Sequence, residues 1–301
     1  MSDTVRVYVG TDRSQLLAVK VLEHSIKRHT SLLVEVYPML DLPVRAPQDP
    51  QNWKRTGFSF SRFCIPALAG YQGKALYLDA DMLVFRDIAE LWSIPFDQAK
   101  VVIQEELPEA RQETHEKFGA PSKRIKQCAV MLLDCGNLDW KIDSIIDALD
   151  NNEYDYDQLM YDLCILAPTD IKYGVPFEWN SLEFYAGGKT GLIHYTDMAT
   201  QPWVSSQNPY GYLWLNELYL MLNNGALSWD EFQHEIDSGY FRPSLVPDLK
   251  YRRWIPTPFQ PLWSHFLQRL DQEAQYKPHR EVYAIKKQRL EALKGYQAAS
   301  S

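Results

Sequence analysis

A strand, a helix and a second strand follow one another in the first forty residues, and this order limits the folds open to the chain. "VRVYVG" (Val5–Gly10) is short, β-branched and followed by Thr-Asp, as in a buried strand that runs into a loop. "SQLLAVKVLEHSIKRHT" has apolar residues at helical spacing from Leu16 to Ile26, with Ser14 as the expected N-cap. "SLLVEVYPML" then indicates a second strand. Such a β-α-β unit predicts a right-handed crossover and a parallel sheet.

Further strands and helices alternate up to about residue 203. We expect strands at "ALYLDADMLVF", "KVVIQEE", "CAVMLLDC" and Gly191–Tyr195, and helices at "SRFCIPALAGY", "DIAELWSI", "LDWKIDSIIDALDN" and "YDYDQLMYDLCIL". A polar segment at 107–127 resembles loops that cover active sites. Beyond it, a helix ending at Gly225, a Ser228/Glu231 capping box and a last helix at 281–294 indicate a helical region. We therefore predict a mixed α/β domain over residues 1–205 and a helical C-terminal extension over 206–301.

Composition excludes several classes of protein. The 301 residues carry a net charge of −8, which argues against a generic nucleic-acid partner. From Phe241 onward there are 11 Lys and Arg against 5 Asp and Glu, so this part carries +6 and the rest −14. No apolar run is long enough to span a bilayer, and the first residues lack the pattern of a signal peptide. The four cysteines have no metal-site spacing, so we expect a cytoplasmic protein with reduced thiols.

Two carboxylates one residue apart interrupt the apolar stretch "LYLDADMLVF". In a straight strand, residues i and i+2 lie on the same face, so one cation can bridge Asp79 and Asp81. The carboxyl end of a parallel strand is also where open α/β sheets bind ligands. Carboxylate oxygens favour Mg²⁺ or Mn²⁺, which keep coordination positions open for phosphate. Turn capping or simple surface charge is the alternative explanation of the pair.

An imidazole at the end of another expected strand, His194 in "LIHYT", is the candidate third ligand. One imidazole among carboxylates shifts the preference towards Mn²⁺. The alternative is a histidine that is satisfied in the core or at the surface without binding metal. The pattern predicts an Mn²⁺ (or Mg²⁺) site formed by Asp79, Asp81 and His194.

Five segments of the chain resemble, in the same order, the motifs of glycosyltransferase family 8. They are "VYVGTD", "SRFCIP" ahead of "KALYLDADMLVFRDIAELW", "CAVMLLD", "YDQLMYD" and "HYTDMATQPW". The family comprises retaining nucleotide-sugar transferases, among them lipopolysaccharide galactosyl- and glucosyltransferases and the glycogenins. The resemblance implies the GT-A fold, a single Rossmann-like nucleotide-binding domain with a mostly parallel sheet. It also implies that a hexose is transferred from a nucleotide sugar, usually a UDP-sugar, to a glycan, lipid-linked or other hydroxyl acceptor.

The resemblance also assigns roles to individual residues. It implies that Asp79, Asp81 and His194 hold Mn²⁺ on the diphosphate of the donor. The donor-binding positions that it implies are Gly10, Thr11, Asp12, Arg62, Ala80, Gln127 and Gln201. For Asp12 the alternative role is a cap on the following helix, and for Arg62 it is a surface salt bridge.

The Asp-Gln pair of the family falls on Asp157 and Gln158, which the resemblance places beside the anomeric carbon of the donor sugar. Retention requires either a covalent nucleophile or attack on the same face, with the acceptor held beside the leaving phosphate. The amide of Gln158 is neutral and weakly basic, so we expect same-face substitution. Gln158 would then be an electrostatic and positioning group, and Asp157 would bind sugar hydroxyls. The alternative is that "YDYDQ" is only an acidic helix start.

Several positions depart from the family pattern. Gln127 and Asp162 stand where the family has asparagine, and Gln201 stands where a lysine touches the diphosphate. The segment from His194 to the Pro-Trp pair is also one residue longer. Loss of one cation there would weaken donor binding by about 1–3 kcal/mol, unless Lys189 in "GGKTG" substitutes for it.

The C-terminal extension fits a family feature, the basic and aromatic tails that contact a membrane beside lipid-linked acceptors. "KYRRWIP", with Trp254 and Trp263, would suit an anionic headgroup region, at the inner face of the membrane for a cytoplasmic protein. Packing within the extension is the alternative for these aromatic residues.

Two other functions stay open at this point. One is a metal-dependent nucleotidyl- or phosphotransferase, although the chain has no Walker motif and no Gly-rich phosphate loop in "VGTDRSQ". The other is a nucleotide-sugar-binding protein with decayed transferase activity, which Gln201 and Asp162 motivate. The complete set of Asp79, Asp81 and His194 favours a working enzyme.

Overall fold

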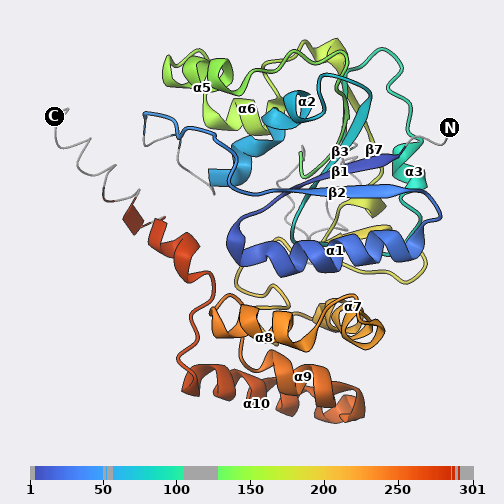
Figure 1. Ribbon diagram of the computed structural model, residues 1–301, viewed down its shortest axis with the longest axis vertical. Coiled ribbons are helices and arrows are strands. Elements are labelled where there is room, and N and C mark those ends of the chain that lie inside the picture. The colour runs from blue at the N-terminus through green and yellow to red at the C-terminus, as the bar shows by residue number, and fades with distance from the viewer. Residues whose placement is uncertain are drawn as a thin grey trace.

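A six-stranded sheet forms the centre of the computed structural model, which describes residues 4–49, 52, 57–104, 128–285, 287–288 and 291. The strand order is β2-β1-β3-β6-β5-β7. Figure 1 labels β1, β2, β3 and β7 of this sheet. The strands are β1 Val5–Gly10, β2 Val34–Met39, β3 Lys74–Asp79, β5 Val101–Gln104, β6 Val130–Asp134 and β7 Ile171–Val175. β1 pairs in parallel with β2 and β3, and β5 with β7, whereas β6 is antiparallel to both of its neighbours. The predicted mostly parallel sheet is confirmed.

The order of the strands reverses between β1 and β3. The chain passes from β1 through helix α1 (Leu16–His29) to β2 on one side, and β3 then pairs with the other side of β1. At this point Gly10 and Asp79 are neighbours across the two strands. Open α/β sheets bind ligands outside the carboxyl ends of the strands where such a reversal occurs. The topology therefore brings the ends of β1 and β3 to the ligand-binding edge.

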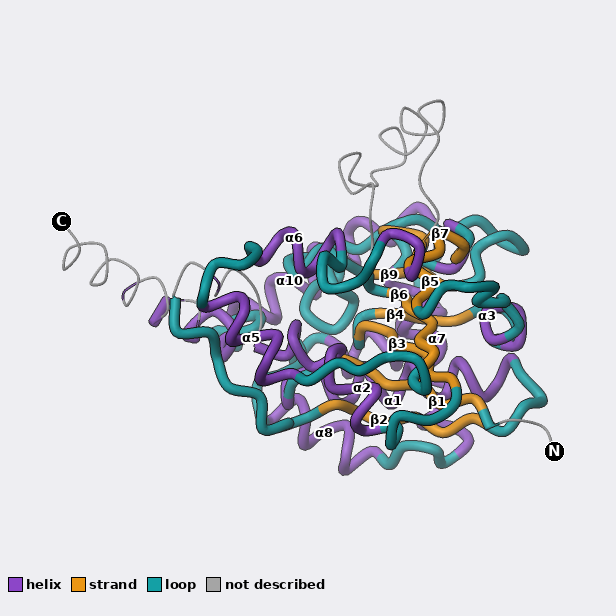
Figure 2. The backbone as a smooth tube through the Cα atoms, turned by 90° about the horizontal axis from the view of Figure 1, so that it is seen from above, coloured by secondary structure: helices purple, strands orange, loops and turns teal. Residues whose placement is uncertain are grey.

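The expected single strand over "ALYLDADMLVF" is wrong, because the chain changes sheets in its middle. β3 ends at Asp79, and β4 (Met82–Val84) belongs to a second sheet with the order β4-β9-β8. Figure 2 labels β4 and β9 of this sheet. The other strands of this sheet are β8 Ser181–Leu182 and β9 Leu192–His194. β4 pairs antiparallel with β9, and Met82 faces His194. Asp81 therefore lies between two strands and not on a continuous one, since the backbone partner of the second half is β9.

Helices cover both faces of the large sheet. α1 packs against the side chains of Val5, Val7 and Val9 on one face. The opposite face carries Tyr8, Tyr77 and Met131, which pack against α5 (Ile142–Asp150) and α6 (Tyr156–Asp162). The remaining elements here are the 3₁₀ helix η3 Gly57–Cys64 and helices α2 Ile65–Leu68 and α3 Ala89–Trp92. The alternating order of strands and helices predicted all of these helices.

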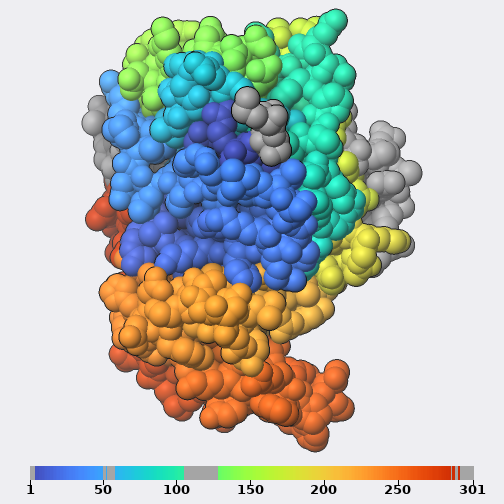
Figure 3. Space-filling model, turned by 45° about the vertical axis from the view of Figure 1, so that its right-hand side comes forward, coloured from blue at the N-terminus to red at the C-terminus, as the bar shows by residue number. Residues whose placement is uncertain are grey.

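The helices of the C-terminal extension form a further layer, which lies below α1 in Figure 1. Its helices are α7 Gly211–Asn224, α8 Trp229–Asp237, α9 Leu245–Tyr251 and α10 Gln260–Glu273, and residues 280–285 are also helical. Leu17 and Val21 of α1 share a buried cluster with Trp214 and Phe241 of the extension. Figure 3 shows the orange surface of the extension directly against the blue N-terminal surface. The two regions thus share one hydrophobic core.

Local signals at helix ends were mostly correct. α7 ends at Gly225 in a left-handed conformation, and Ser228 and Glu231 form the predicted capping box of α8. Ser14 as the N-cap of α1 is wrong, because a 3₁₀ turn, η1 (Arg13–Gln15), precedes the helix. Asp12 caps this turn by accepting from the backbone N–H of Ser14 at 2.8 Å. All four cysteines are free, and no helix within the described residues is long and apolar enough to cross a membrane.

Candidate active site

Three potential metal ligands meet at the strand reversal. Asp79 ends β3, Asp81 follows two residues later, and His194 ends β9. His194 Nε2 lies 3.0 Å from Asp81 Oδ1 and 3.8 Å from Asp79 Oδ2. One ligand atom from each residue lies within 4.8 Å of the others, so the three can hold one metal ion.

The orientation of His194 is fixed through its other ring nitrogen. Nδ1 lies 2.9 Å from Asn180 Oδ1, so Nδ1 carries the proton. Asn180 in turn donates from Nδ2 to Gln104 Oε1 at 2.6 Å, which sets the direction of its amide. All three side chains are buried. In the neutral imidazole the lone pair is therefore on Nε2, the nitrogen that faces the two carboxylates.

The carboxylate of Asp79 is held from within its own strand. The Tyr77 hydroxyl donates to Asp79 Oδ1 at 2.5 Å and accepts from Arg62 Nη2 at 3.1 Å. The Arg62 guanidinium lies over the Tyr77 ring and 3.8 Å from Asp79 Oδ1. Arg62 is mostly buried and also donates to the carbonyl of Cys128 at 2.6 Å, so it is not in a surface salt bridge. Gly10 makes room for this arrangement, because a Cβ there would overlap the Tyr77 hydroxyl.

Asp81 is held by Gln201, one of the residues that depart from the resembled motifs. Gln201 donates from Nε2 to Asp81 Oδ2 at 2.9 Å and to the Tyr195 carbonyl at 3.0 Å. The other oxygen, Asp81 Oδ1, is buried without a hydrogen-bond partner among the described residues. It lies against His194 Nε2, which bears a lone pair in the neutral tautomer.

These contacts fit a divalent cation. In each candidate ligand, one atom is hydrogen-bonded to a neutral neighbour and a second atom points towards the shared centre. The neighbours are Tyr77 for Asp79, Gln201 for Asp81 and Asn180 for His194. Lone pairs that face one another across 3.0 Å repel unless a proton or a cation lies between them. Two carboxylates and one imidazole form a donor set that suits Mn²⁺ or Mg²⁺. The cluster is therefore compatible with a divalent metal.

Burial and charge both act on the ionisable groups. Burial raises the pKa of the Asp79 carboxyl above its ordinary value, and the positive charge of Arg62 opposes this rise, as does His194 when it is protonated. Burial alone would lower the pKa of Arg62, but Tyr77 and Asp79 raise it, so the guanidinium stays charged. Burial also raises the pKa of the Tyr77 phenol well above its usual value. Tyr77 therefore remains a hydrogen-bond donor to Asp79 at neutral pH.

The other predicted donor-binding residues come from several segments of the chain. Gly10 ends β1 and Thr11 follows it, and Thr11 and Ala80 are buried. Asp12 has the capping role that was its alternative, since its carboxylate accepts from Ser14. Gln127 lies outside the described residues, as does the expected cover loop at 107–127. Lys189 lies beyond the far end of β9 from His194, where its carbonyl accepts from Arg86, so its position does not favour a substitute for the missing lysine.

The predicted catalytic pair lies in the first turn of α6. Gln158 closes a capping box, because its Oε1 accepts from the N–H of Asp155 at 2.8 Å while its own N–H binds the Asp155 carboxylate. Asp157 and Gln158 are exposed, whereas the preceding residue, Tyr156, is buried. Tyr156 is close enough to Arg62 to raise the pKa of its guanidinium. At the start of α6, Tyr156 is therefore the residue that lies near Arg62.

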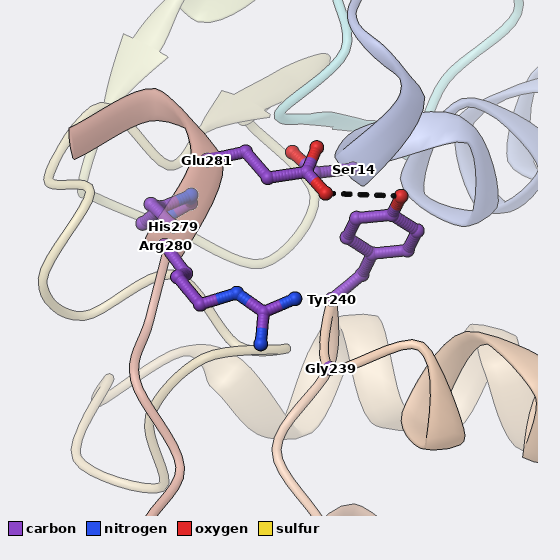
Figure 4. Close-up of a pocket in the computed structure, with 6 residues that line it drawn as sticks. All are labelled: Ser14, Gly239, Tyr240, His279, Arg280 and Glu281. Atoms are coloured by element: carbon purple, nitrogen blue, oxygen red, sulfur yellow. Dashed lines mark hydrogen bonds between the residues drawn. The ribbon is translucent and has the colours of Figure 1, made fainter. Parts of the chain in front are cut away.

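Part of the C-terminal extension also reaches the site. His279 is buried, and its Nε2 lies 2.9 Å from the carbonyl of Met198, in the loop between His194 and Gln201. Figure 4 shows the small crevice where His279, Arg280 and Glu281 meet Ser14 and Tyr240. Asp12 and Asp81 both lie close enough to influence the pKa of His279. Sequence reasoning did not identify His279, since only the folded chain brings it to this loop.

Sequence reasoning also missed Tyr77, Asn180 and Gln104. Tyr77 had a signal, because it stands two residues before Asp79 on a strand and so shares its face. Asn180 and Gln104 had none, since Gln104 ends β5 and Asn180 precedes β8, and the chain from Gln104 through Asn180 to His194 forms only in three dimensions.

Comparisons with known proteins agree with this architecture. The family model described as Glycosyl transferase family 8 matches residues 7–149. Protein CDI from Arabidopsis thaliana is 28% identical over 230 residues, which cover 71% of this chain and 85% of that protein. Galactosyltransferase LgtC, solved in complex with donor and acceptor sugar analogues, has a TM-score of 0.52 at 13% identity and covers 77% of this chain and 100% of its own. Apo glycosyltransferase GlyE of Streptococcus pneumoniae TIGR4 has a TM-score of 0.50 at 16% identity, over 80% of this chain and 65% of that one. The chain therefore has the predicted GT-A fold.

Proposed function

Because residues 7–149 match the model of glycosyltransferase family 8, we propose that this chain is a metal-dependent, retaining hexosyltransferase of that family that uses a nucleotide sugar, with UDP as the nucleotide. The observation that carries the proposal is the cluster of Asp79, Asp81 and His194 at the strand reversal. Open sheets bind nucleotides at such a reversal, and a diphosphate there requires a positive partner. LgtC was solved with donor and acceptor sugar analogues bound, which supports the same two substrate classes here.

Asp79, Asp81 and His194 would hold the cation, which we take to be Mn²⁺ or Mg²⁺. When bound, it would neutralise the charge that builds up on the departing nucleoside diphosphate. Arg62 would add a fixed positive charge beside Asp79, and its planar group suits phosphate oxygens or sugar hydroxyls. Gly10, Thr11 and Asp12 would line the nucleoside site, together with Ala80 and Gln127.

Asp157 and Gln158 remain our proposed pair at the donor sugar. The capping bond occupies Gln158 Oε1, so its amide nitrogen is the atom we propose for contact with the substrate. A neutral amide can orient the sugar and the acceptor but is a poor nucleophile, which favours substitution on the same face. Asp157 would bind hydroxyls of the donor sugar.

The acceptor is a hydroxyl of a glycan, of a lipid-linked sugar or of another compound in this proposal. Residues 1–205 would form the catalytic domain of a cytoplasmic protein, and residues 206–301 would form an extension that contacts the membrane peripherally. Trp254 is 71% exposed and lies beside Arg252 and Arg253, and Phe259 and Leu262 are also exposed. Exposed aromatic and basic side chains together suit an anionic headgroup region. Trp263 does not join them, because it donates to Asp248 and packs on Phe266.

Calorimetric titration with UDP, with and without Mn²⁺, is the direct test. We expect binding that requires both Mn²⁺ and an intact Asp81, so that Asp81→Ala abolishes it. Asp139→Ala is the matched control, because this aspartate is exposed and should leave binding unchanged. If UDP binds equally well without metal, or equally well to Asp81→Ala, the assignment of the site is wrong.

Hydrolysis of UDP-sugars in the presence of Mn²⁺ separates the remaining alternatives. Slow release of free hexose with retained anomeric configuration is the expected result for the transferase. Metal-dependent UDP binding without any turnover would instead point to the nucleotide-sugar-binding protein. Transfer of a nucleotidyl or phosphoryl group would indicate the other enzyme class.

A further inference from the structure

The contact between Gln201 and Asp81 points to a role for Gln201 that differs from the one its place in the motif implies. We infer that Gln201 is a positioning residue that fixes the carboxylate of Asp81 for the metal and does not bind the diphosphate itself. This inference rests on the proposed metal site. The buried amide of Gln201 binds one oxygen of the Asp81 carboxylate and so leaves the other, Oδ1, available as a metal ligand.

The amide nitrogen of Gln201 is fully used. Nε2 donates to Asp81 Oδ2 at 2.9 Å and to the carbonyl of Tyr195 at 3.0 Å. Both neighbours are acceptors, so the nitrogen and not the oxygen of the amide must face them. Two N–H groups thus meet two acceptors, and no donor is left on the side chain for a phosphate oxygen.

The backbone around Gln201 holds the side chain in this place. Its N–H donates to the carbonyl of Asp197 at 3.0 Å, and its own carbonyl accepts from Val204 and Ser205 at 2.9 and 3.0 Å. The residue is 1% exposed, and its Oε1 is buried without a hydrogen-bond partner among the described residues. A swing of the side chain towards a bound donor would break both bonds of Nε2. Gln201 therefore acts on the reaction through Asp81.

The neutral amide also changes the charge beside the metal. A lysine at this position would place a cation against the same carboxylate and compete with the divalent metal for it. Gln201 holds Asp81 Oδ2 without adding positive charge, which strengthens the hold of the cluster on the metal. The cost is one phosphate-binding cation fewer, so the donor depends more strongly on the metal.

Binding of Mn²⁺ alone tests the inference, because it can be followed by the electron paramagnetic resonance signal of free Mn²⁺ without substrate or turnover. Gln201→Met removes both hydrogen bonds at similar volume, and we expect a loss of metal affinity of about tenfold to a hundredfold, the range for residues that orient metal ligands. Gln207→Met is the matched control, since Gln207 is exposed six residues further along the same segment. Unchanged Mn²⁺ affinity in Gln201→Met would overturn the inference.

Gln201→Lys supplies a signature that a merely structural role cannot produce. We expect it to lower the affinity for Mn²⁺ by about tenfold, the effect of one charged contact, and to allow UDP to bind in the absence of metal, which the wild type does not. If the affinity for Mn²⁺ stays unchanged, or if it falls without any gain of metal-free UDP binding, the positioning role is wrong. This variant also keeps the test decisive if Gln201→Met does not fold.

The outcomes distinguish this inference from the proposed function. If the wild-type protein binds Mn²⁺ but no UDP, and Gln201→Met lowers Mn²⁺ affinity, the positioning role stands and the donor assignment falls. If the wild-type protein binds Mn²⁺ no better than Asp81→Ala, both fall together.

Discussion

The hydroxyl of Tyr77 donates to Oδ1 of Asp79 at 2.5 Å, from two residues earlier in the same strand. One aromatic side chain therefore aims a carboxylate that we assign to the metal. The same hydroxyl accepts from Arg62, so it also links that carboxylate to the buried guanidinium. Tyr77 is fully buried, and the orientation of Asp79 is set by the core of the sheet and not by solvent.

Tyr77→Phe should weaken metal binding while leaving the fold intact. The ring and its contact with Arg62 remain, but Asp79 loses its donor and Arg62 loses an acceptor. We expect Mn²⁺ affinity to fall about tenfold, measured by titration with paramagnetic detection. Tyr154→Phe is the control, because it deletes a hydroxyl bonded to the carbonyl of Ile145 within the α5 region. Equal loss of Mn²⁺ affinity in both variants would contradict the role of Tyr77.

Gly10→Ala, on the neighbouring strand β1, should disturb the hydrogen bond from Tyr77 that orients Asp79. A Cβ at Gly10 would overlap the Tyr77 hydroxyl, so the phenol must move away from Asp79. We expect a loss of about 1–3 kcal/mol in the free energy of unfolding from overpacking, together with weaker Mn²⁺ binding. Urea denaturation and Mn²⁺ titration measure the two effects. Gly187→Ala should change neither, because a Cβ there meets no atom within 4 Å.

Local pattern explains how much of this site could be predicted. The β-α-β order fixes β1, α1 and β2, and the two aspartates after an apolar run indicate the edge at which a ligand binds. His194 followed from its place at the end of a short apolar strand. These features depend on residues close in sequence, so the chain alone contains them.

Long-range contacts explain what could not be predicted. Asp81 and Gln201 are 120 residues apart, and Gln104 and Asn180 are 76 apart, so no local pattern shows either bond. The break between β3 and β4 has the same cause, since the apolar run continues and the new partner strand, β9, comes about a hundred residues later. The family motif has a lysine at the position of Gln201. The motif alone therefore does not show that the side chain of Gln201 contacts a proposed metal ligand.

Glu217 joins the proposed catalytic domain to the extension, and its loss should destabilise both together. It is 3% exposed, and it accepts from Arg28 and lies 2.6 Å from His24 Nδ1, both on α1. Glu217→Ala would leave these cationic or polar groups without their partner, at a cost of about 1–3 kcal/mol. Because the two regions share one hydrophobic core, we expect a single thermal transition that shifts downwards as a whole.

The control for Glu217 is another ion pair across the same boundary. Lys20 of α1 pairs with Glu231 of α8 at 3.1 Å, and both side chains are about half exposed. Exposed pairs contribute little, so Lys20→Ala should leave the midpoint of unfolding unchanged. Two separate transitions in Glu217→Ala, with only one of them shifted, would show that the extension folds independently.

His279 should make the protein less stable at mildly acidic pH. Burial lowers the pKa of its imidazole below 6.5, although Asp12 and Asp81 oppose this shift. Well above pH 6.5 the imidazole is neutral in the folded and unfolded states, so it contributes no pH dependence there. As the pH falls, the unfolded chain takes up the proton first, and stability is lost until the pH passes the lowered folded pKa.

His279→Asn should reduce this loss of stability in acid. His279 has a φ of 48°, a conformation that asparagine tolerates well, although its shorter amide does not replace the bond of Nε2 to the carbonyl of Met198. We expect the free energy of unfolding to fall less between about pH 7 and about pH 5 in the variant than in the wild type, as urea denaturation would show. His265→Asn, at an exposed position, should keep the pH profile of the wild type. If His279→Asn loses as much stability in acid as the wild type, the buried imidazole is not the group that titrates.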